Sequence, residues 1–151
     1  MPATASAQVT LQEITEETLR PILRLEVADN QKHFVATNAV SIAQAHFSKN
    51  AWFRAIYADE TPVGFVMLYI DEEKPEYFVW RFMIDKSHQG KGYGRQALLK
   101  VIDHVRGLPD AKELFLSYVP KEGSPLPFYR KLGFEETGEW DEGEKIMKLI
   151  L

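Results

Sequence analysis

The stretch from Phe78 to Arg106 constrains the fold most, because it joins an apolar strand, a glycine-rich turn and a long amphipathic helix. Residues 78–84 (FVWRFMI) are rich in the aromatic and β-branched residues that favour a half-buried strand. After the turn, apolar residues recur at i, i+1, i+4, i+5 and i+8, a spacing that keeps them on one helix face: Ala97, Leu98, Val101, Ile102 and Val105. The sequence therefore predicts a strand, a turn and a helix ending at Gly107.

The turn itself predicts an anion site. It consists of Gln89, Gly90, Lys91, Gly92, Tyr93, Gly94 and Arg95. Glycines at alternate positions leave backbone N–H groups uncovered, and the positive end of the following helix favours a phosphate or pyrophosphate there. The two cations, Lys91 and Arg95, strengthen this interpretation. The alternative is that the glycines only make a tight strand-to-helix turn.

Length and composition limit the class of protein. A chain of 151 residues has the size of one domain, so residues 1–151 are expected to form a single unit with a hydrophobic core. The absence of cysteine excludes disulfides, a thiolate nucleophile and thiolate metal ligands. The four histidines are isolated and lack ligand spacing, so no metal site is predicted: His33, His46, His88 and His104.

Charge and hydropathy limit the partners and the location expected of this protein. The net charge of −4, from 22 acidic and 18 basic residues, argues against a nucleic-acid surface and is compatible with a cationic substrate. No apolar run approaches the roughly 20 residues of a membrane span. The N-terminal residues 1–7 lack the features of a signal peptide, so a cytoplasmic location without a membrane partner is expected.

The remaining segments predict an α/β domain in the order β-α-α-β-β-β-α-β-α-β-β. Strands are expected at 9–14, 52–57, 63–70, 78–84, 114–118, 135–140 and 145–151. One helix is expected to begin near Thr18, and a second, capped by Asn38 or Thr37, to carry Val40, Ile42, Ala43 and Phe47. A short helix capped by Ser124 would present Phe128 and Tyr129.

Glu26 continues the apolar stripe of the first helix, where an acid is unusual. Either the helix frays and the carboxylate turns into water, or Glu26 and the nearby Asp29 line a pocket for an ammonium group. Trp80 also has two interpretations, as a stacking surface for a cationic substrate or as an ordinary core residue.

Two segments resemble one known family. Gln89-x-x-Gly92-x-Gly94 is similar to the Gln/Arg-x-x-Gly-x-Gly/Ala signature of the GCN5-related N-acetyltransferases (GNAT), and residues 128–134 (FYRKLGF) resemble that family's aromatic-Tyr-x-x-x-Gly-Phe segment. The resemblance extends from about Gln8 to the C-terminus. Within the family it looks closest to bacterial spermine/spermidine acetyltransferases, most visibly over residues 77–94 and 30–45.

The resemblance implies the GNAT fold, a mixed and mostly antiparallel sheet flanked by helices, and acetyl-coenzyme A (acetyl-CoA) as cosubstrate. It implies that the glycine-rich turn holds the pyrophosphate, that backbone N–H groups near Met83 and Ile84 cover the thioester carbonyl, and that Tyr129 protonates the leaving thiolate. Without the motif, Tyr129 would be interpreted as an ordinary half-buried tyrosine. A polyamine acceptor and a homodimer are further expectations from the family.

The general base departs from the family pattern. Several polyamine acetyltransferases have a glutamate on the central strand where this chain has Trp80, followed by Arg81. Glu26 or another carboxylate could act through water, or the amine could arrive deprotonated. A free alkylammonium has a pKa near 10, so some base is expected.

Other classes of protein fit less well. Gly92-x-Gly94-x-x-Ala97 matches a dinucleotide fingerprint loosely, but the next strand, which ends at residues 116–119 (LSYV), supplies no acid for the ribose. A phosphate-binding Walker loop fails because Gly90-Lys91 is followed by Gly92. Other acceptors, namely another small amine or a protein N-terminus, and a non-catalytic coenzyme A sensor remain open alternatives.

Overall fold

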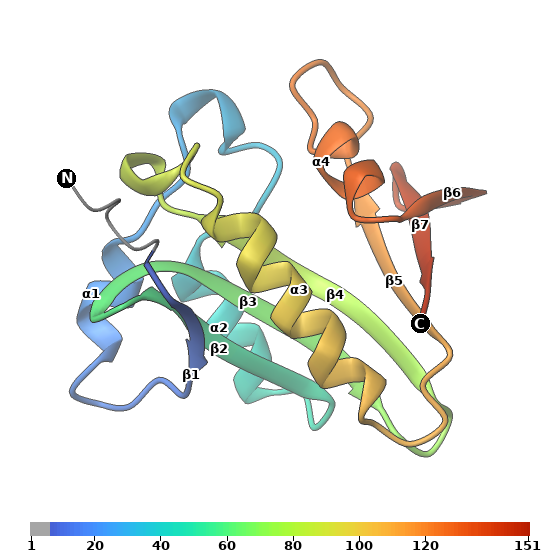
Figure 1. Ribbon diagram of the computed structural model, residues 1–151, viewed down its shortest axis with the longest axis horizontal. Coiled ribbons are helices and arrows are strands. Elements are labelled where there is room, and N and C mark those ends of the chain that lie inside the picture. The colour runs from blue at the N-terminus through green and yellow to red at the C-terminus, as the bar shows by residue number, and fades with distance from the viewer. Residues whose placement is uncertain (1–6) are drawn as a thin grey trace, which may run out of the picture.

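The computed structural model describes residues 7–151 and consists of one seven-stranded sheet with helices on both faces (Figure 1). The elements are β1 (Val9–Gln12), α1 (Leu19–Arg24), η1 (Asp29–Gln31), α2 (Asn38–His46), β2 (Ala51–Ala58), β3 (Thr61–Asp71), β4 (Glu76–Ile84), η2 (Lys86–His88), α3 (Tyr93–Arg106), β5 (Glu113–Tyr118), α4 (Leu126–Lys131), β6 (Glu135–Asp141) and β7 (Glu144–Ile150). The predicted order of helices and strands is confirmed. The N-terminal residues 1–6, expected to carry no signal peptide, lie outside the described part.

The strand order is β1-β2-β3-β4-β5-β7-β6, and all neighbours are antiparallel except β4 and β5. The parallel pair is joined by α3, which crosses one face of the sheet. Because β7 pairs with β5, the closing β6–β7 hairpin forms the edge of the sheet next to β5, opposite the edge formed by β1. This topology gives the GNAT fold expected from the resemblance.

The helix α3 buries the face that its sequence predicts. Its five fully or nearly fully buried residues are Ala97, Leu98, Val101, Ile102 and Val105. They pack in one core cluster with Val66, Leu68 and Val79 of the sheet. The expected end at Gly107 is confirmed, but with φ −83° this residue does not adopt the left-handed conformation of a glycine stop.

The second face of the sheet is covered by α1 and α2, around a smaller cluster that includes Ile22, Phe65 and Met83. The predicted apolar stripe of α2 is wrong in part. Val40 and Phe47 are 47% and 87% exposed, whereas the polar Asn38 and Ser41 are buried. Asn38 is buried at little cost because its Nδ2 donates to the Ile22 carbonyl over 2.9 Å.

The helix α1 ends at Arg24, so Glu26 does not continue a helical stripe as the sequence suggested. Its backbone N–H instead donates to Asp85 Oδ1 over 2.9 Å, and its carbonyl accepts from the Lys86 N–H over 2.8 Å. These bonds tie the segment after α1 to the end of β4. Within residues 7–151, no helix is long and apolar enough to cross a membrane.

Candidate active site

The two parallel strands β4 and β5 are paired over a very short length. Their only register pairs are Phe78 with Phe115 and Val79 with Leu116. β4 continues to Ile84 and β5 to Tyr118, so beyond these pairs the strands separate and leave a gap in the sheet. A cavity fills this gap, lined by β4, β5, α4, the β6–β7 hairpin and the loop before α3. We call it the β4–β5 cavity.

A β-bulge shapes the β4 wall of the cavity. Met67 of β3 pairs with Arg81 while the next residue, Leu68, pairs with Val79, so Trp80 is an extra residue in β4. An extra residue resets the alternation of side chains, and Trp80 and Arg81 both turn towards the α2 side. Trp80 packs against the smaller core cluster, and Arg81 Nη2 donates to Gln44 Oε1 of α2 over 3.0 Å.

The glycine-rich loop presents free backbone N–H groups to the cavity. Gly90 and Gly92 have φ of +79° and +83°, a conformation that glycine adopts most readily, and a Cβ at either position would meet no atom within 4 Å. Within residues 7–151, the backbone N–H groups from Gly90 to Arg95 donate no hydrogen bond. They stand at the N-terminus of the 14-residue α3, which gives them the partial positive charge that attracts a phosphate.

The structure brings nearly all of the predicted cofactor residues to one wall. The residues that line the cavity are Met83, Ile84, Gln89, Gly90, Gly92, Tyr93, Gly94 and Arg95, whereas Lys91 does not line it. Gln89 holds the loop in place, because its Nε2 donates to the Ile84 carbonyl over 2.9 Å and to Gln31 Oε1 over 2.8 Å. Their role in holding acetyl-CoA stays a prediction.

Tyr129 lies on α4 with its side chain in the cavity wall, only 8% exposed. Gly133, with φ +101°, ends the helix, and Phe134 then packs edge-on against the Tyr129 ring at 6.0 Å between centroids. This contact gives the Tyr-x-x-x-Gly-Phe spacing a physical reason. Burial, and then the negative charge of Glu144, raise the pKa of Tyr129 to about 12, so its hydroxyl keeps its proton at neutral pH.

A second tyrosine, Tyr118 of β5, also lines the cavity but differs in its hydrogen bonding. Its hydroxyl donates to Glu136 Oε1, whereas the Tyr129 hydroxyl has no hydrogen-bond partner among residues 7–151. Burial and then this bond raise the pKa of Tyr118 to about 12. Of the two hydroxyls, only that of Tyr129 is free to donate to a bound molecule.

The structure places one of the three predicted acceptor residues in the cavity wall and the other two outside it. Trp80 lines the cavity, but Glu26 and Asp29 do not. Glu26 Oε1 lies 2.6 Å from Lys86 Nζ, and Asp29 Oδ1 lies 2.9 Å from Lys32 Nζ. These lysines lower the pKa of both carboxyls, the hydrogen bond with Lys86 being the largest cause for Glu26 and that with Lys32 for Asp29. Both carboxylates are therefore paired with lysines, and a role in acceptor binding stays a prediction.

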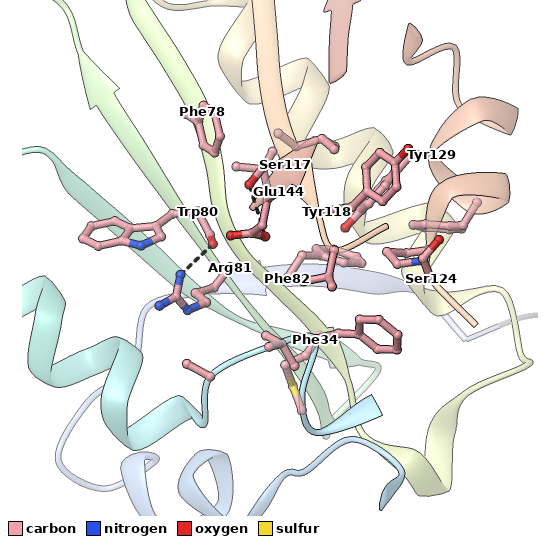
Figure 2. A pocket seen from close by; sticks show the side chains of 18 of the residues that line it. Phe34, Phe78, Trp80, Arg81, Phe82, Ser117, Tyr118, Ser124, Tyr129 and Glu144 are labelled. Carbon is pink, nitrogen blue, oxygen red and sulfur yellow. Dashed lines mark hydrogen bonds between the residues drawn. The ribbon is translucent and has the colours of Figure 1, made fainter. Parts of the chain in front are cut away.

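The carboxylates of the β6–β7 hairpin were not predicted from the sequence. Four of them line the cavity: Glu139, Asp141, Glu142 and Glu144. Glu144 is half-buried, and its Oε1 lies 3.5 Å from Ser117 Oγ of β5 (Figure 2). The sequence offers no signal for this arrangement, because the pairing of β7 with β5 joins segments about 30 residues apart. Among the described residues, no group of three or more metal-ligand side chains occurs.

Comparison with known proteins identifies the family. A model of the "Acetyltransferase (GNAT) family" matches residues 12–134. The chain belongs to this family, and it is an acetyl-CoA-dependent N-acetyltransferase. Its cosubstrate is acetyl-CoA.

Individual relatives agree with this assignment. A spermine/spermidine N(1)-acetyltransferase of Bacillus subtilis (strain 168) is 31% identical over 149 residues, 92% of this chain and 96% of the relative. An acetyltransferase from Thermus thermophilus has a similar structure (TM-score 0.78, 14% identity, 97% of this chain and 100% of that chain). A GNAT acetyltransferase from Elizabethkingia anophelis with acetyl-CoA bound also has this fold (TM-score 0.67, 19% identity, 95% of this chain and 98% of that chain).

Proposed function

We propose that this enzyme transfers the acetyl group of acetyl-CoA to a primary amine of a polyamine, spermidine or spermine, by direct attack of the amine on the thioester. The observation that carries the proposal is the acidic hairpin wall of the β4–β5 cavity, formed by Glu139, Asp141, Glu142 and Glu144. Polyamine amines have pKa values near that of lysine and are cations at neutral pH, so a wall of carboxylates attracts them. The spermine/spermidine relative supports the same acceptor.

The positions of the residues support the roles that we assign to them. The free N–H groups of the loop from Gly90 to Arg95 hold the pyrophosphate of acetyl-CoA, and the backbone near Met83 and Ile84 holds the thioester in the gap between β4 and β5. Tyr129, with a free and protonated hydroxyl, donates the proton to the departing thiolate. Trp80 lies on the β4 wall, where its ring can stack on a cationic acceptor.

The proposal is tested by measuring free thiol release from acetyl-CoA with spermidine, spermine, an amino sugar and a peptide with a free N-terminus. Saturable release with the two polyamines is the expected result. Release with only the peptide or only the amino sugar would identify that compound, and not a polyamine, as the acceptor. Tight coenzyme A binding without turnover of any amine would instead indicate a non-catalytic sensor.

The acidic wall has its own matched test. The triple variant Glu139→Gln, Asp141→Asn, Glu142→Gln should raise the KM for spermidine several-fold and leave the KM for acetyl-CoA unchanged. The control variant Glu16→Gln, Glu60→Gln, Glu73→Gln removes the same charge from exposed positions outside the cavity. An equal rise in KM in both variants would show that the effect comes from net charge, and would contradict a specific role of the hairpin carboxylates in binding spermidine.

Three broader expectations are carried forward as proposals: residues 1–151 act as one domain, the protein works in the cytoplasm without nucleic acid or membrane as partner, and two copies form a homodimer. The net charge of −4 supports the absence of a nucleic-acid partner. Sedimentation of the purified chain in the presence of coenzyme A tests the dimer, and a monomer at micromolar concentration would contradict it.

A further inference from the structure

Glu144 differs from the other carboxylates of the hairpin wall. It is the first residue of β7 and is half-buried, whereas Glu139, Asp141 and Glu142 are exposed. Its side chain turns into the β4–β5 cavity beside Ser117 (Figure 2), and Trp80 and Arg81 of β4 line the same cavity. Within residues 7–151, Glu144 forms no ion pair, and the contact with Ser117 Oγ at 3.5 Å is long for a hydrogen bond. It is therefore a carboxylate with free acceptor capacity.

The titratable groups that line the cavity around Glu144 include Arg81 of β4, Tyr118 of β5, Tyr129 of α4 and Asp141 of β6. Asp141 is the register partner of Glu144. The charge of Glu144 reaches the opposite wall, since it raises the pKa of Arg81 against the larger lowering by burial. Arg81 Nη1 donates to the Trp80 carbonyl and Nη2 to Gln44 Oε1, whereas its buried Nε has no hydrogen-bond partner within residues 7–151. The Glu144 carboxylate is left open to a further cation.

We infer that Glu144 is the general base that removes a proton from the acceptor ammonium. The inference rests on the proposed amine acetylation and supplies the base that deprotonation of the acceptor ammonium requires. Glu144 lies at the point where β4 and β5 begin to separate, close to Ser117, and Tyr129 lines the same cavity. Glu144 lines the same cavity as Met83 and Ile84, near which the thioester is proposed to lie.

The proton balance is simple. Glu144 accepts one proton from the ammonium, and the neutral nitrogen attacks the thioester carbon, forming the C–N bond. The tetrahedral intermediate collapses, the C–S bond breaks, and the thiolate takes the proton of Tyr129. The nitrogen then loses its second proton to solvent. The Tyr129 phenolate regains a proton from solvent, and Glu144 releases its proton to water. Per turnover, one ammonium and one thioester give one amide, one thiol and one free proton.

The test is Glu144→Gln, which keeps the shape of the side chain and removes the base. At pH 7 we expect turnover with spermidine to fall on the order of 100-fold or more, the range of general base catalysis, with the KM for acetyl-CoA unchanged. Between pH 7 and pH 9 the variant should recover about tenfold per pH unit, because the free amine fraction of the substrate rises by that factor below the amine pKa, and the recovery should level off near pH 10. Tyr129 keeps its proton through this range, since its pKa is about 12.

The control is Glu135→Gln, an exposed carboxylate on β6 that does not line the cavity; it should behave like the wild type at every pH. Coenzyme A affinity and melting temperature of Glu144→Gln show that the variant is folded, and Glu144→Asp should retain part of the activity at pH 7. Wild-type turnover in Glu144→Gln, or a loss that stays constant up to pH 10, overturns the role as base while the polyamine proposal stands. If the wild type itself acetylates no amine, both proposals fail.

Discussion

The Tyr118 hydroxyl donates its hydrogen to Glu136 Oε1, whereas Tyr129, which lines the same β4–β5 cavity as Tyr118, keeps its own hydroxyl free. Glu136 also lies 2.9 Å from Arg130 Nη2 and 3.8 Å from Lys145 Nζ. The two tyrosines have similar burial and the same pKa of about 12, so their hydrogen bonds, and not their acidity, separate a structural tyrosine from a candidate acid.

This difference predicts opposite results for two phenylalanine variants. Tyr129→Phe should lower turnover by roughly 100- to 10,000-fold, the range of general acid catalysis, with coenzyme A binding intact. Tyr118→Phe should cost far less turnover, because its hydroxyl is already donated and Glu136 keeps two cationic partners. Thiol release and calorimetric binding of coenzyme A measure both effects. Equal losses in the two variants would remove the distinction, and unchanged turnover in Tyr129→Phe would remove the acid role.

Substitutions of glycines inside and outside the glycine-rich loop should separate an effect on stability from an effect on coenzyme A binding. Gly92→Ala and Gly138→Ala place a Cβ at φ of +83° and +85°, with no atom within 4 Å of either. Each should lose about 1–2 kcal/mol of stability through the left-handed conformation. Only Gly92→Ala should also weaken coenzyme A binding, because Gly92 lines the cavity at the loop where the pyrophosphate is expected. Denaturant unfolding and calorimetry check this, and equal coenzyme A affinity in the two variants would contradict the loop as the pyrophosphate site.

Gly64 of β3 predicts a large packing effect. A Cβ at this position would overlap the Met83 carbonyl oxygen and lie 2.9 Å from Ile84 Cδ1, so the backbone of β3 or β4 would have to shift. Gly64→Ala should destabilise the protein by about 1–3 kcal/mol or more, as overpacking does. The control Gly107→Ala, at φ −83° with its nearest atom at 3.6 Å, should be neutral or stabilising. Urea unfolding at pH 7 measures both, and a stable Gly64→Ala would contradict the close approach.

The lowered pKa of Glu136 should account for part of the loss of stability of the fold at acid pH. Its hydrogen bond from Tyr118, and then the charges of Lys145 and Arg130, hold its pKa below the ordinary value of 4.5. A carboxyl whose pKa is lower in the folded than in the unfolded state stabilises the fold above its unfolded pKa, and this contribution is lost as pH falls through the folded pKa. Glu136→Gln should therefore be less stable than the wild type at pH 7, with the difference shrinking below pH 4.5. Melting temperatures from pH 7 to pH 3 measure this, and a constant difference would contradict the linkage.

Local patterns predicted much of the fold because the information lies within each segment. The i, i+4 spacing of α3 identified its five buried residues, since one helix face determines one core face. The stripe of α2 was mispredicted because hydrogen bonding overrode hydrophobicity there. The buried side chain of Asn38 donates a hydrogen bond to the Ile22 carbonyl, whereas Val40 and Phe47 lie in solvent. Glu26 was assigned to a helical stripe because its bonds to residues 85 and 86 are not visible in its own segment.

The sequence alone determined the elements, the glycine-rich loop at the start of α3 and the Tyr129 motif, because each depends on residues close together in the chain. The tertiary structure decided which side chains share the cavity. The β4 bulge turns Trp80 and Arg81 to one face, and the pairing of β7 with β5 places Glu144 beside Ser117. Both depend on strand register between distant segments, which hydrogen bonding and packing of the whole sheet fix, and no local spacing encodes it.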